Sequence, residues 1–152
     1  MIRVRIATEK DCVLISEVLF ENQLIIESEP LSKNQCDHTV KDHLTNERFM
    51  VTFWDEDCLV GVCFHTLIYP NLVNCHTNVH KNYRGKGLLY KLKMMDYSVC
   101  KRLGYSIVSI VPESNVKIIK SNFKAGYVFA GHLPKTKNRD GNMISRIILF
   151  KE

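Results

Sequence analysis

The sequence predicts a single α+β domain over residues 1–152, with a mixed, mostly antiparallel sheet of about seven strands flanked by about four helices. Three observations lead to this fold class. Alternating and continuous apolar runs indicate strands, apolar residues at helical spacing lie between them, and the central strands have connections too short to cross over. The length suits one domain with its own core.

The first part of the chain predicts a strand followed by two helices. Apolar residues alternate with arginines over 2–6, which indicates a half-buried strand. Thr8 can cap the first helix, with Asp11 as the acid of a capping box. The acidic stretch 21–35 reads as a helix end running into a loop, and a second short helix is expected over about 38–46.

The centre of the chain predicts an antiparallel meander and then a long helix. Strand-like runs cover 49–54, 59–69 and 72–79, separated by short polar turns. Apolar residues then recur at helical spacing from Leu88 to Leu103, and Gly104 ends that helix.

The last third predicts a strand, a helix and two further strands. The run 106–111 follows a long helical connection, so it can pair in parallel with the strand over 72–79. A helix is expected over 115–125 and a short strand over 127–131. The basic stretch 131–142 reads as a loop, and 143–150 as the last strand.

The charge is distributed unevenly along the chain. Residues 1–80 hold 6 Lys and Arg against 12 Asp and Glu, whereas residues 81–152 hold 15 against 4. The second part therefore favours an anionic ligand, and the first part is expected to line the site of a cationic one. There is no membrane-length apolar run and no apolar signal core at the N-terminus, so we expect a cytoplasmic protein without a membrane partner.

The six cysteines are scattered without a Cys-x-x-Cys pair. This pattern is typical of free, mostly buried thiols in a reducing compartment, and we expect no metal site. The alternative is a zinc site formed by Cys75, His76 and His80, although this stretch reads better as part of a strand.

The stretch NYRGKGLLYKL, residues 82–92, carries the clearest functional signal. Glycines at 85 and 87 precede the predicted helix, where backbone N–H groups and the helix dipole attract an anion. Arg84 and Lys86 add full positive charges, which predicts a pyrophosphate site. The alternative is a loop whose glycines only turn the chain. The pattern G-x-x-x-x-G-K-[ST] is absent, and G-x-G-x-x-G fails because Tyr90 stands at its third glycine.

The loop and the order of elements resemble the GCN5-related N-acetyltransferase (GNAT) family. Its signature Arg/Gln-x-x-Gly-x-Gly/Ala corresponds to Arg84-Gly85-Lys86-Gly87-Leu88-Leu89, with Leu89 in place of the final Gly or Ala. The block over 113–131 is similar to the family's next helix and strand, with Asn115 at the asparagine and Gly126 at the glycine. The resemblance covers nearly the whole chain.

The resemblance implies transfer of an acetyl group from acetyl-CoA to a primary amine by direct attack in a ternary complex. It implies that the pyrophosphate of acetyl-CoA lies on the backbone of Gly85 to Leu89, beside the Arg84 side chain. Backbone groups near Val79 would pair with the pantetheine arm, and Asn115 would contact the cofactor near that arm. Dimers are common in this family, so a homodimer is consistent with the resemblance.

Two residues carry the catalytic expectations. His76, on the strand before the loop, is the best-placed general base, and a packed or exposed strand histidine is the alternative; His65 and His80 are weaker candidates for the base. The family often places a tyrosine in the following helix to protonate the leaving thiolate, and this position holds Asn122. The alternative function is therefore a catalytically weak or inactive binding protein with the GNAT fold. Binding of nucleic acid by the basic half is a further alternative, which we do not expect.

Overall fold

The structure, a computed structural model, describes residues 1–26, 31–44, 48–137 and 141–152. Its elements are β1 (Ile2–Ile6), the 3₁₀ turn η1 (Glu9–Asp11), α1 (Cys12–Ile26), α2 (Lys33–Asp42), β2 (Arg48–Asp55), β3 (Cys58–Tyr69), β4 (Leu72–Val79), the 3₁₀ turn η2 (Lys81–Tyr83), α3 (Leu88–Arg102), β5 (Ser106–Pro112), α4 (Val116–Lys124), β6 (Val128–Lys137) and β7 (Met143–Lys151). The predicted α+β class and the order of elements are confirmed.

The strands form one sheet in the order β1-β2-β3-β4-β5-β7-β6. All neighbours pair antiparallel except β4 and β5, which are parallel as expected from the helical connection between them. The pairing of β4 with β5 covers only Leu72–Asn74 with Ser106–Val108. Beyond Asn74, the edge of β4 therefore has no strand beside it on the β5 side within the described sheet.

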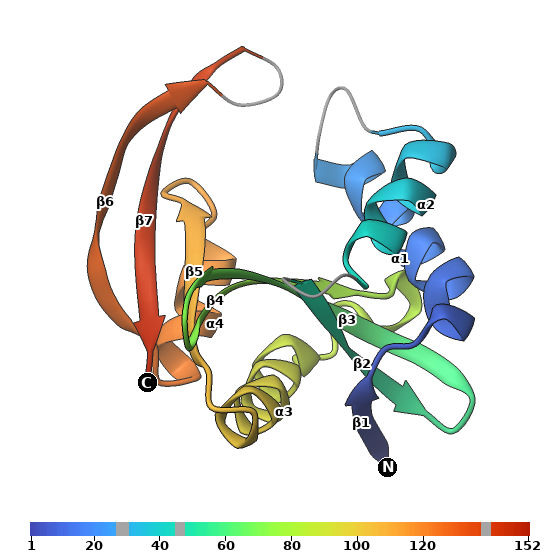
Figure 1. Ribbon diagram of the computed structural model, residues 1–152. Helices are drawn as coiled ribbons and strands as arrows, with labels where there is room; N and C mark the ends of the chain where they lie inside the picture. Colours follow the sequence, from blue (N-terminus) through green and yellow to red (C-terminus); the bar gives the residue numbers. More distant parts are fainter. Residues whose placement is uncertain (27–30, 45–47, 138–140) are drawn as a thin grey trace.

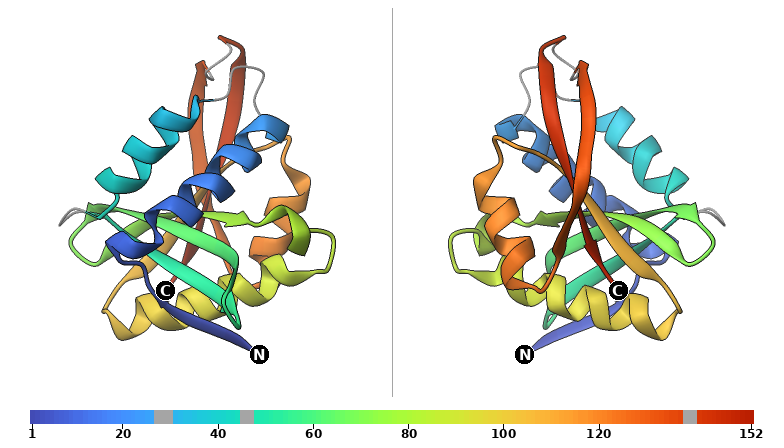
Figure 2. Two further views of the ribbon diagram at one scale, coloured as in Figure 1. Left: turned by 90° about the vertical axis from the view of Figure 1, so that its right-hand side faces the viewer. Right: turned by 90° about the vertical axis from the view of Figure 1, so that its left-hand side faces the viewer.

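The sheet separates two hydrophobic cores. One core joins α1 and α2 to the sheet residues Met50, Val62 and Phe64. The other core joins α3 to strand residues whose side chains point to the opposite face of the sheet, such as Val51 and Cys63. Figures 1 and 2 show α1 and α2 on one face and α3 with α4 on the other, while the long β6–β7 hairpin stands opposite α1 and α2.

Two predicted boundaries were wrong. The second helix begins at Lys33 rather than near residue 38, because the Ser32 hydroxyl accepts a hydrogen bond from the Gln35 backbone N–H and the Gln35 side chain accepts one from the Ser32 N–H. This helix ends at Asp42, and part of its predicted end lies outside the described residues.

The basic stretch after Gly131 is not a loop at its start, because β6 continues to Lys137. The β6–β7 register shifts between Phe129 and Gly131 and again between Leu133 and Thr136. Such irregularities accommodate Pro134, which has no N–H to donate. Residues 138–140 of the predicted loop lie outside the described residues. None of the described helices combines the length and the apolar character needed to cross a membrane.

Candidate functional site

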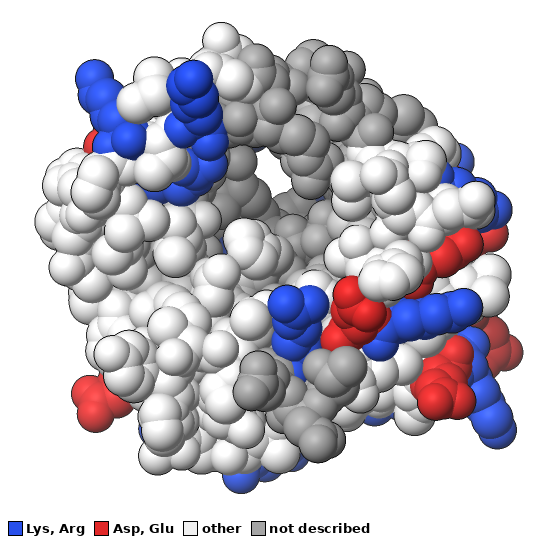
Figure 3. Space-filling model, turned by 45° about the horizontal axis from the view of Figure 1, so that its top comes forward, with Lys and Arg blue, Asp and Glu red and all other residues white. Residues whose placement is uncertain are grey.

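A cavity of about 390 Å³ opens where β4 and β5 separate. Figure 3 shows the molecule hollowed on this face. Residues from both faces of the sheet contribute to this cavity. Its lining residues are Leu19, Asn22, Leu31, Thr39, His43, Phe64, Cys75, His76, Thr77, Asn78, Lys93, Ser109, Ile110, Val111, Pro112, Asn115 and Ile118.

No Asp or Glu is among these described lining residues, although the first part of the chain is acidic. Glu21, one of the acids in the first part of the chain, instead forms an ion pair with Lys81, with 2.7 Å between Oε1 and Nζ.

His76 stands on β4 on the face covered by α1 and α2, directly opposite Phe64 of β3. Its side chain is exposed to the cavity, yet atoms of neighbouring elements surround it, and this burial lowers the pKa of His76 below its ordinary value of 6.5. Asn74 Nδ2 lies 3.1 Å from His76 Nε2. A neutral imidazole on the wall of a cavity can accept a proton from a ligand.

A second histidine, His43, lines the same cavity from the end of α2. Its Nδ1 lies 2.9 Å from the carbonyl oxygen of Thr39, and its ring contacts Phe64 edge to face at 5.1 Å. Burial lowers the pKa of His43 as well. Sequence reasoning missed His43, because only the tertiary contact of α2 with β3 brings it to the cavity.

The β5 side of the cavity carries Ser109, and Asn122 lies behind it. Asn122 Nδ2 donates a hydrogen bond to Ser109 Oγ at 3.1 Å, and the Asn122 side chain is fully buried. Ser109 lines the cavity and Asn122 does not. Asn115 also lines it, while its Oδ1 caps α4 by accepting from the Ile118 N–H at 3.3 Å.

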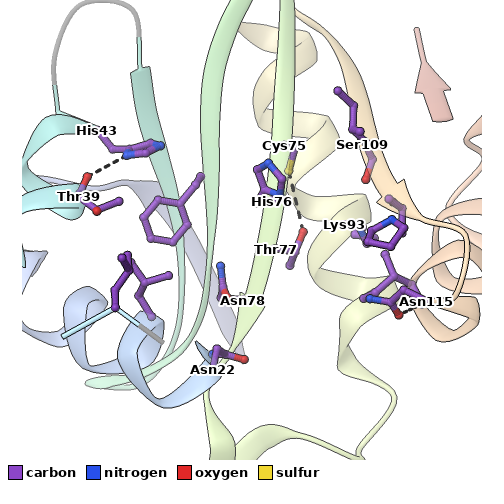
Figure 4. Close-up of a pocket in the computed structure, with 17 residues that line it drawn as sticks. Asn22, Thr39, His43, Cys75, His76, Thr77, Asn78, Lys93, Ser109 and Asn115 are labelled. Atoms are coloured by element: carbon purple, nitrogen blue, oxygen red, sulfur yellow. Dashed lines mark hydrogen bonds between the residues drawn. The ribbon is translucent and has the colours of Figure 1, made fainter. Parts of the chain in front are cut away.

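Lys93 brings a positive charge to the cavity from α3, on the opposite face of the sheet. Its side chain is 2% exposed, and its Nζ lies 5.6 Å from the centre of the Tyr127 ring. Among the described lining residues, Lys93 is the single Lys or Arg. Figure 4 shows Lys93 near Ser109 and Asn115, across from His43 and Thr39. Lys93 is not part of the apolar stripe from Leu88 to Leu103, so the spacing did not predict a cation on the cavity wall.

The predicted anion site follows β4 after the 3₁₀ turn η2. Gly85 and Gly87 have φ angles of 74° and 68°, and a Cβ at either position would meet no atom within 4 Å. Gly87 is the N-cap of α3 and has no side chain to bind the first N–H groups of the helix, which begins at Leu88 and Leu89. The space above this loop thus faces free backbone donors and the positive end of the helix dipole.

Arg84 is the charged residue of the predicted anion site that contacts β4. Its Nε donates a hydrogen bond to the Val79 carbonyl oxygen at 3.1 Å, and its Nη2 is buried with no hydrogen-bond partner among the described residues. A buried guanidinium N–H without a partner is costly. Lys86 lies nearby, with Nζ 5.2 Å from the centre of the Tyr83 ring.

The Val79 carbonyl is already bound, since it also accepts from Asn22 Nδ2 at 3.3 Å. The N–H of His80 bonds the carbonyl of Val60 on β3. Because backbone groups alternate along a strand, the N–H of Val79 points the other way, toward the split between β4 and β5.

The alternative zinc set of Cys75, His76 and His80 is not brought together. Cys75 and His76 both line the cavity, but as neighbours on β4 their side chains point to opposite faces of the sheet. His80 binds the Asn82 N–H through its Nδ1 at 3.2 Å. His65, a weaker candidate for the general base, is fully buried and does not line the cavity.

Comparison with solved structures places this arrangement among known folds. A candidate phosphinothricin N-acetyltransferase superposes with a TM-score of 0.80 at 21% identity, over 100% of this chain and 98% of that one. The chain has the GNAT fold. Spermidine N-acetyltransferase from Vibrio cholerae in complex with CoA and spermine matches with a TM-score of 0.79 at 19% identity, over 98% and 94% of the chains.

A third structure with the GNAT fold is the candidate acetyltransferase YncA from Salmonella typhimurium with its cofactor acetyl-CoA. It matches with a TM-score of 0.78 at 16% identity, over 99% of this chain and 93% of that one. No model of a protein family and no curated protein matches the sequence. The likeness is therefore one of fold, and it confirms the fold that the loop and the order of elements predicted.

Proposed function

We propose that the protein is a cytoplasmic N-acetyltransferase that uses acetyl-CoA as co-substrate and a primary amine as acceptor. The observation that carries this proposal is the continuity of two sites. The open edge of β4 borders the cavity and leads directly into the Arg84–Gly87 anion site. Solved structures with this fold contain acetyl-CoA, or CoA with spermine, which supports both the co-substrate and an amine acceptor.

The residues of the loop fit the pyrophosphate of acetyl-CoA. The N–H groups from Gly85 to Leu89, together with Arg84 Nη2, would hold it, and the positive φ of both glycines keeps the approach open. The half-buried Leu89 adds a side chain next to the site, where the family has Gly or Ala. Acetyl-CoA supplies a thioester that is activated toward amines, and the N–H of Val79 would pair with its pantetheine arm.

His76 would accept the proton of the acceptor amine. Its lowered pKa keeps the imidazole neutral at pH 7, and its side chain faces the cavity. Lys93 would stabilise the negative charge that develops as the thioester bond breaks, because it is the single described cation on the wall. Both groups line the same cavity, in which the amine would attack the thioester.

Asn122 would act through Ser109 rather than on the co-substrate. Because Asn122 Nδ2 donates to Ser109 Oγ, the Ser109 hydroxyl keeps its own proton for a contact into the cavity. This arrangement gives the cavity a hydrogen-bond donor on the wall where the family's tyrosine is missing. Asn115 would border the pantetheine arm from the start of α4.

A second candidate function is a protein with this fold that binds CoA without efficient catalysis. It is favoured by Asn122, which is buried and cannot act as an acid, and by Leu89 in the loop. The two functions differ in turnover and share the binding site.

Calorimetry with acetyl-CoA tests the binding site. We expect micromolar binding by the wild type and a loss of at least about tenfold in affinity for Gly87→Glu, which places a carboxylate against the pyrophosphate. Gly104→Glu is the matched control, because Gly104 lies just beyond the other end of α3 with a φ of 82° and equally open space. No binding by the wild type would refute the proposal.

Transfer to a panel of amines then separates the two functions. The panel contains a polyamine, an amino acid, an aminoglycoside and a peptide with a free N-terminus, and the released thiol is measured. Turnover with any of them supports the enzyme. Binding of acetyl-CoA without turnover on the whole panel would favour the second candidate.

A further inference from the structure

The two faces of the sheet give the cavity two different sides. Phe64 and His76 are directly opposite each other in the β3–β4 register, and Phe64 belongs to the core under α1 and α2. Asn74, two residues before His76, pairs with Val108 of β5, and these side chains share that face. His76 therefore lies on the face of α1 and α2, whereas Lys93 reaches the cavity from α3 on the other face.

The strand register carries the face of His76 across the split to the β6–β7 hairpin. Ile110 and Pro112 follow Val108 at alternate positions of β5, so they share its face, and both line the cavity. Pro112 pairs with Arg146 of β7. Arg146 thus lies on the same face of the sheet as His76, at the rim of the cavity. It belongs to the hairpin that stands opposite α1 and α2 in Figures 1 and 2.

Arg146 has no carboxylate partner in the described part of the chain. Its Nη1 donates to Thr136 Oγ1 across the hairpin, and it takes part in none of the ion pairs among the described residues. Glu113, the residue after Pro112, pairs with His132 instead, with 2.9 Å between Oε1 and Nδ1. A guanidinium carries its N–H donors in a planar fork that matches a carboxylate, so most donors of Arg146 are left for an acidic ligand.

The described charges around the cavity are positive or neutral. Lys93 is the single Lys or Arg on the described wall, and no described Asp or Glu lines it. Figure 3 shows further Lys and Arg side chains beside the hollow, over the hairpin. Burial lowers the pKa values of His43 and His76, so both rings are neutral at pH 7. A second ammonium on the acceptor would meet like charge here, whereas an acidic group would meet the unpaired Arg146.

We propose that the acceptor is an amino acid, whose amine faces His76 and whose carboxylate binds Arg146 across the split between β4 and β5. The proposal rests on the proposed transfer reaction and narrows its acceptor to amines that carry an acidic group. His76 and Arg146 share one face of the sheet, so a small molecule that spans the cavity on this face can contact both. Lys93, on the other face, stays available for the charge that develops on the co-substrate.

The wall on the side of α1 and α2 favours an apolar side chain on this amino acid. Leu19, Leu31 and Phe64 line it, and the neutral ring of His43 lies edge to face with Phe64. An apolar or aromatic side chain would leave water when it packs against these residues, which is favourable. A charged side chain would lose its hydration there without a described partner of opposite charge. Leucine, methionine and phenylalanine are therefore the acceptors of choice.

Matched acceptors test the proposal on the full-length chain. Acetyl transfer is measured with leucine, methionine and phenylalanine, with the carboxamide of each, and with spermidine. At least one amino acid is expected to exceed its own carboxamide and spermidine by about tenfold or more in kcat/KM. A carboxamide or spermidine that reacts as fast as the amino acids would overturn the proposal. If acetyl-CoA binds without turnover, calorimetry with the same amino acids and saturating CoA decides, and no binding by any of them overturns it. A chain that does not bind acetyl-CoA refutes the proposed function instead.

Arg146→Gln assigns the contact with the carboxylate. It is expected to lower kcat/KM for the best amino acid by about tenfold or more, mainly through KM, and to leave that for its carboxamide nearly unchanged. Arg146→Lys keeps the charge and should keep part of the preference for the acid. Arg3→Gln, an exposed arginine on the edge strand β1, is the matched control and should keep the full preference. An acid-to-carboxamide ratio that Arg146→Gln leaves unchanged would overturn the contact. If Arg146→Gln does not fold by circular dichroism, the ratio measured on the wild type still decides the acceptor class.

Discussion

Arg84 Nε donates a hydrogen bond to the carbonyl oxygen of Val79, the last residue of β4, at 3.1 Å. This bond joins the anion loop to the end of the strand that borders the cavity. Asn22 from α1 binds the same carbonyl at 3.3 Å, so strand, loop and first helix converge on one atom. The two parts of the proposed co-substrate site therefore hold a fixed relation to each other.

Arg84→Gln is expected to weaken binding of CoA. The amide keeps a donor for the Val79 carbonyl and removes the charge and Nη2, which has no partner among the described residues. A hydrogen bond to a charged group contributes about 1.5–3 kcal/mol, which corresponds to a loss of roughly 10- to 150-fold in affinity. Calorimetry measures the change, and Arg102→Gln at the other end of α3 should leave affinity unchanged. Equal affinity for wild type and Arg84→Gln would contradict the role of Arg84.

His76→Gln is expected to remove the acid limb of the pH–rate profile. Burial lowers the pKa of His76 from 6.5, so the wild type should lose kcat/KM as the pH falls through that lowered value and the imidazole becomes charged. Loss of a general base typically costs about 10²–10⁴-fold in rate. Steady-state rates across the pH range measure both effects, with His38→Gln on the exposed face of α2 as control. A profile of His76→Gln that superimposes on that of the wild type would remove His76 from the mechanism.

Lys93→Met is expected to lower kcat at least about tenfold, because the cavity loses its single described cation while the volume of the side chain is nearly kept. Removing a buried charge should not lower the thermal midpoint. Lys91→Met, an exposed lysine two residues earlier on α3, serves as control. Stopped-flow and steady-state assays separate kcat from KM, and an unchanged kcat would show that Lys93 is only part of the wall.

Asp11→Asn is expected to destabilise the fold by about 1–3 kcal/mol through loss of a charged hydrogen-bonded pair. Both oxygens of Asp11 accept from Arg5 at 2.7 Å. These bonds lower the pKa of Asp11 from 3.8, so its contribution is complete above that value and is lost as the pH falls through the lower folded pKa. Urea unfolding at several pH values should show the difference from wild type shrinking in acid. Asp57→Asn, fully exposed beside Arg3, should leave the midpoint unchanged.

Local patterns predicted most of the fold. Strand alternation, helical spacing and the two positive-φ glycines at 85 and 87 are encoded in neighbouring residues, so the elements and the anion loop could be predicted. The extension of β6 to Lys137 could not be predicted, because its pairing with β7 depends on two register shifts that no local sequence pattern indicates.

The walls of the cavity depend on distant contacts. Asn122 contacts Ser109, which is 13 residues away in the sequence, and His65 contacts Asp96, which is 31 residues away. Cys75 and His76 are adjacent in sequence and point to opposite faces of the sheet, and the register with β3 sets which residue of β4 lies opposite Phe64. Spacing along the chain cannot supply that register.

The contact between β4 and β5 covers only three positions, so the sheet is narrow at this joint. Four strands lie on one side of the joint and three on the other, and the chain connects them through α3. A molecule that bonds to the free edge of β4 acts as a temporary eighth strand and restores continuity across the joint. Occupancy should therefore stiffen the two halves together, and slower amide exchange should extend along strands that the molecule never touches.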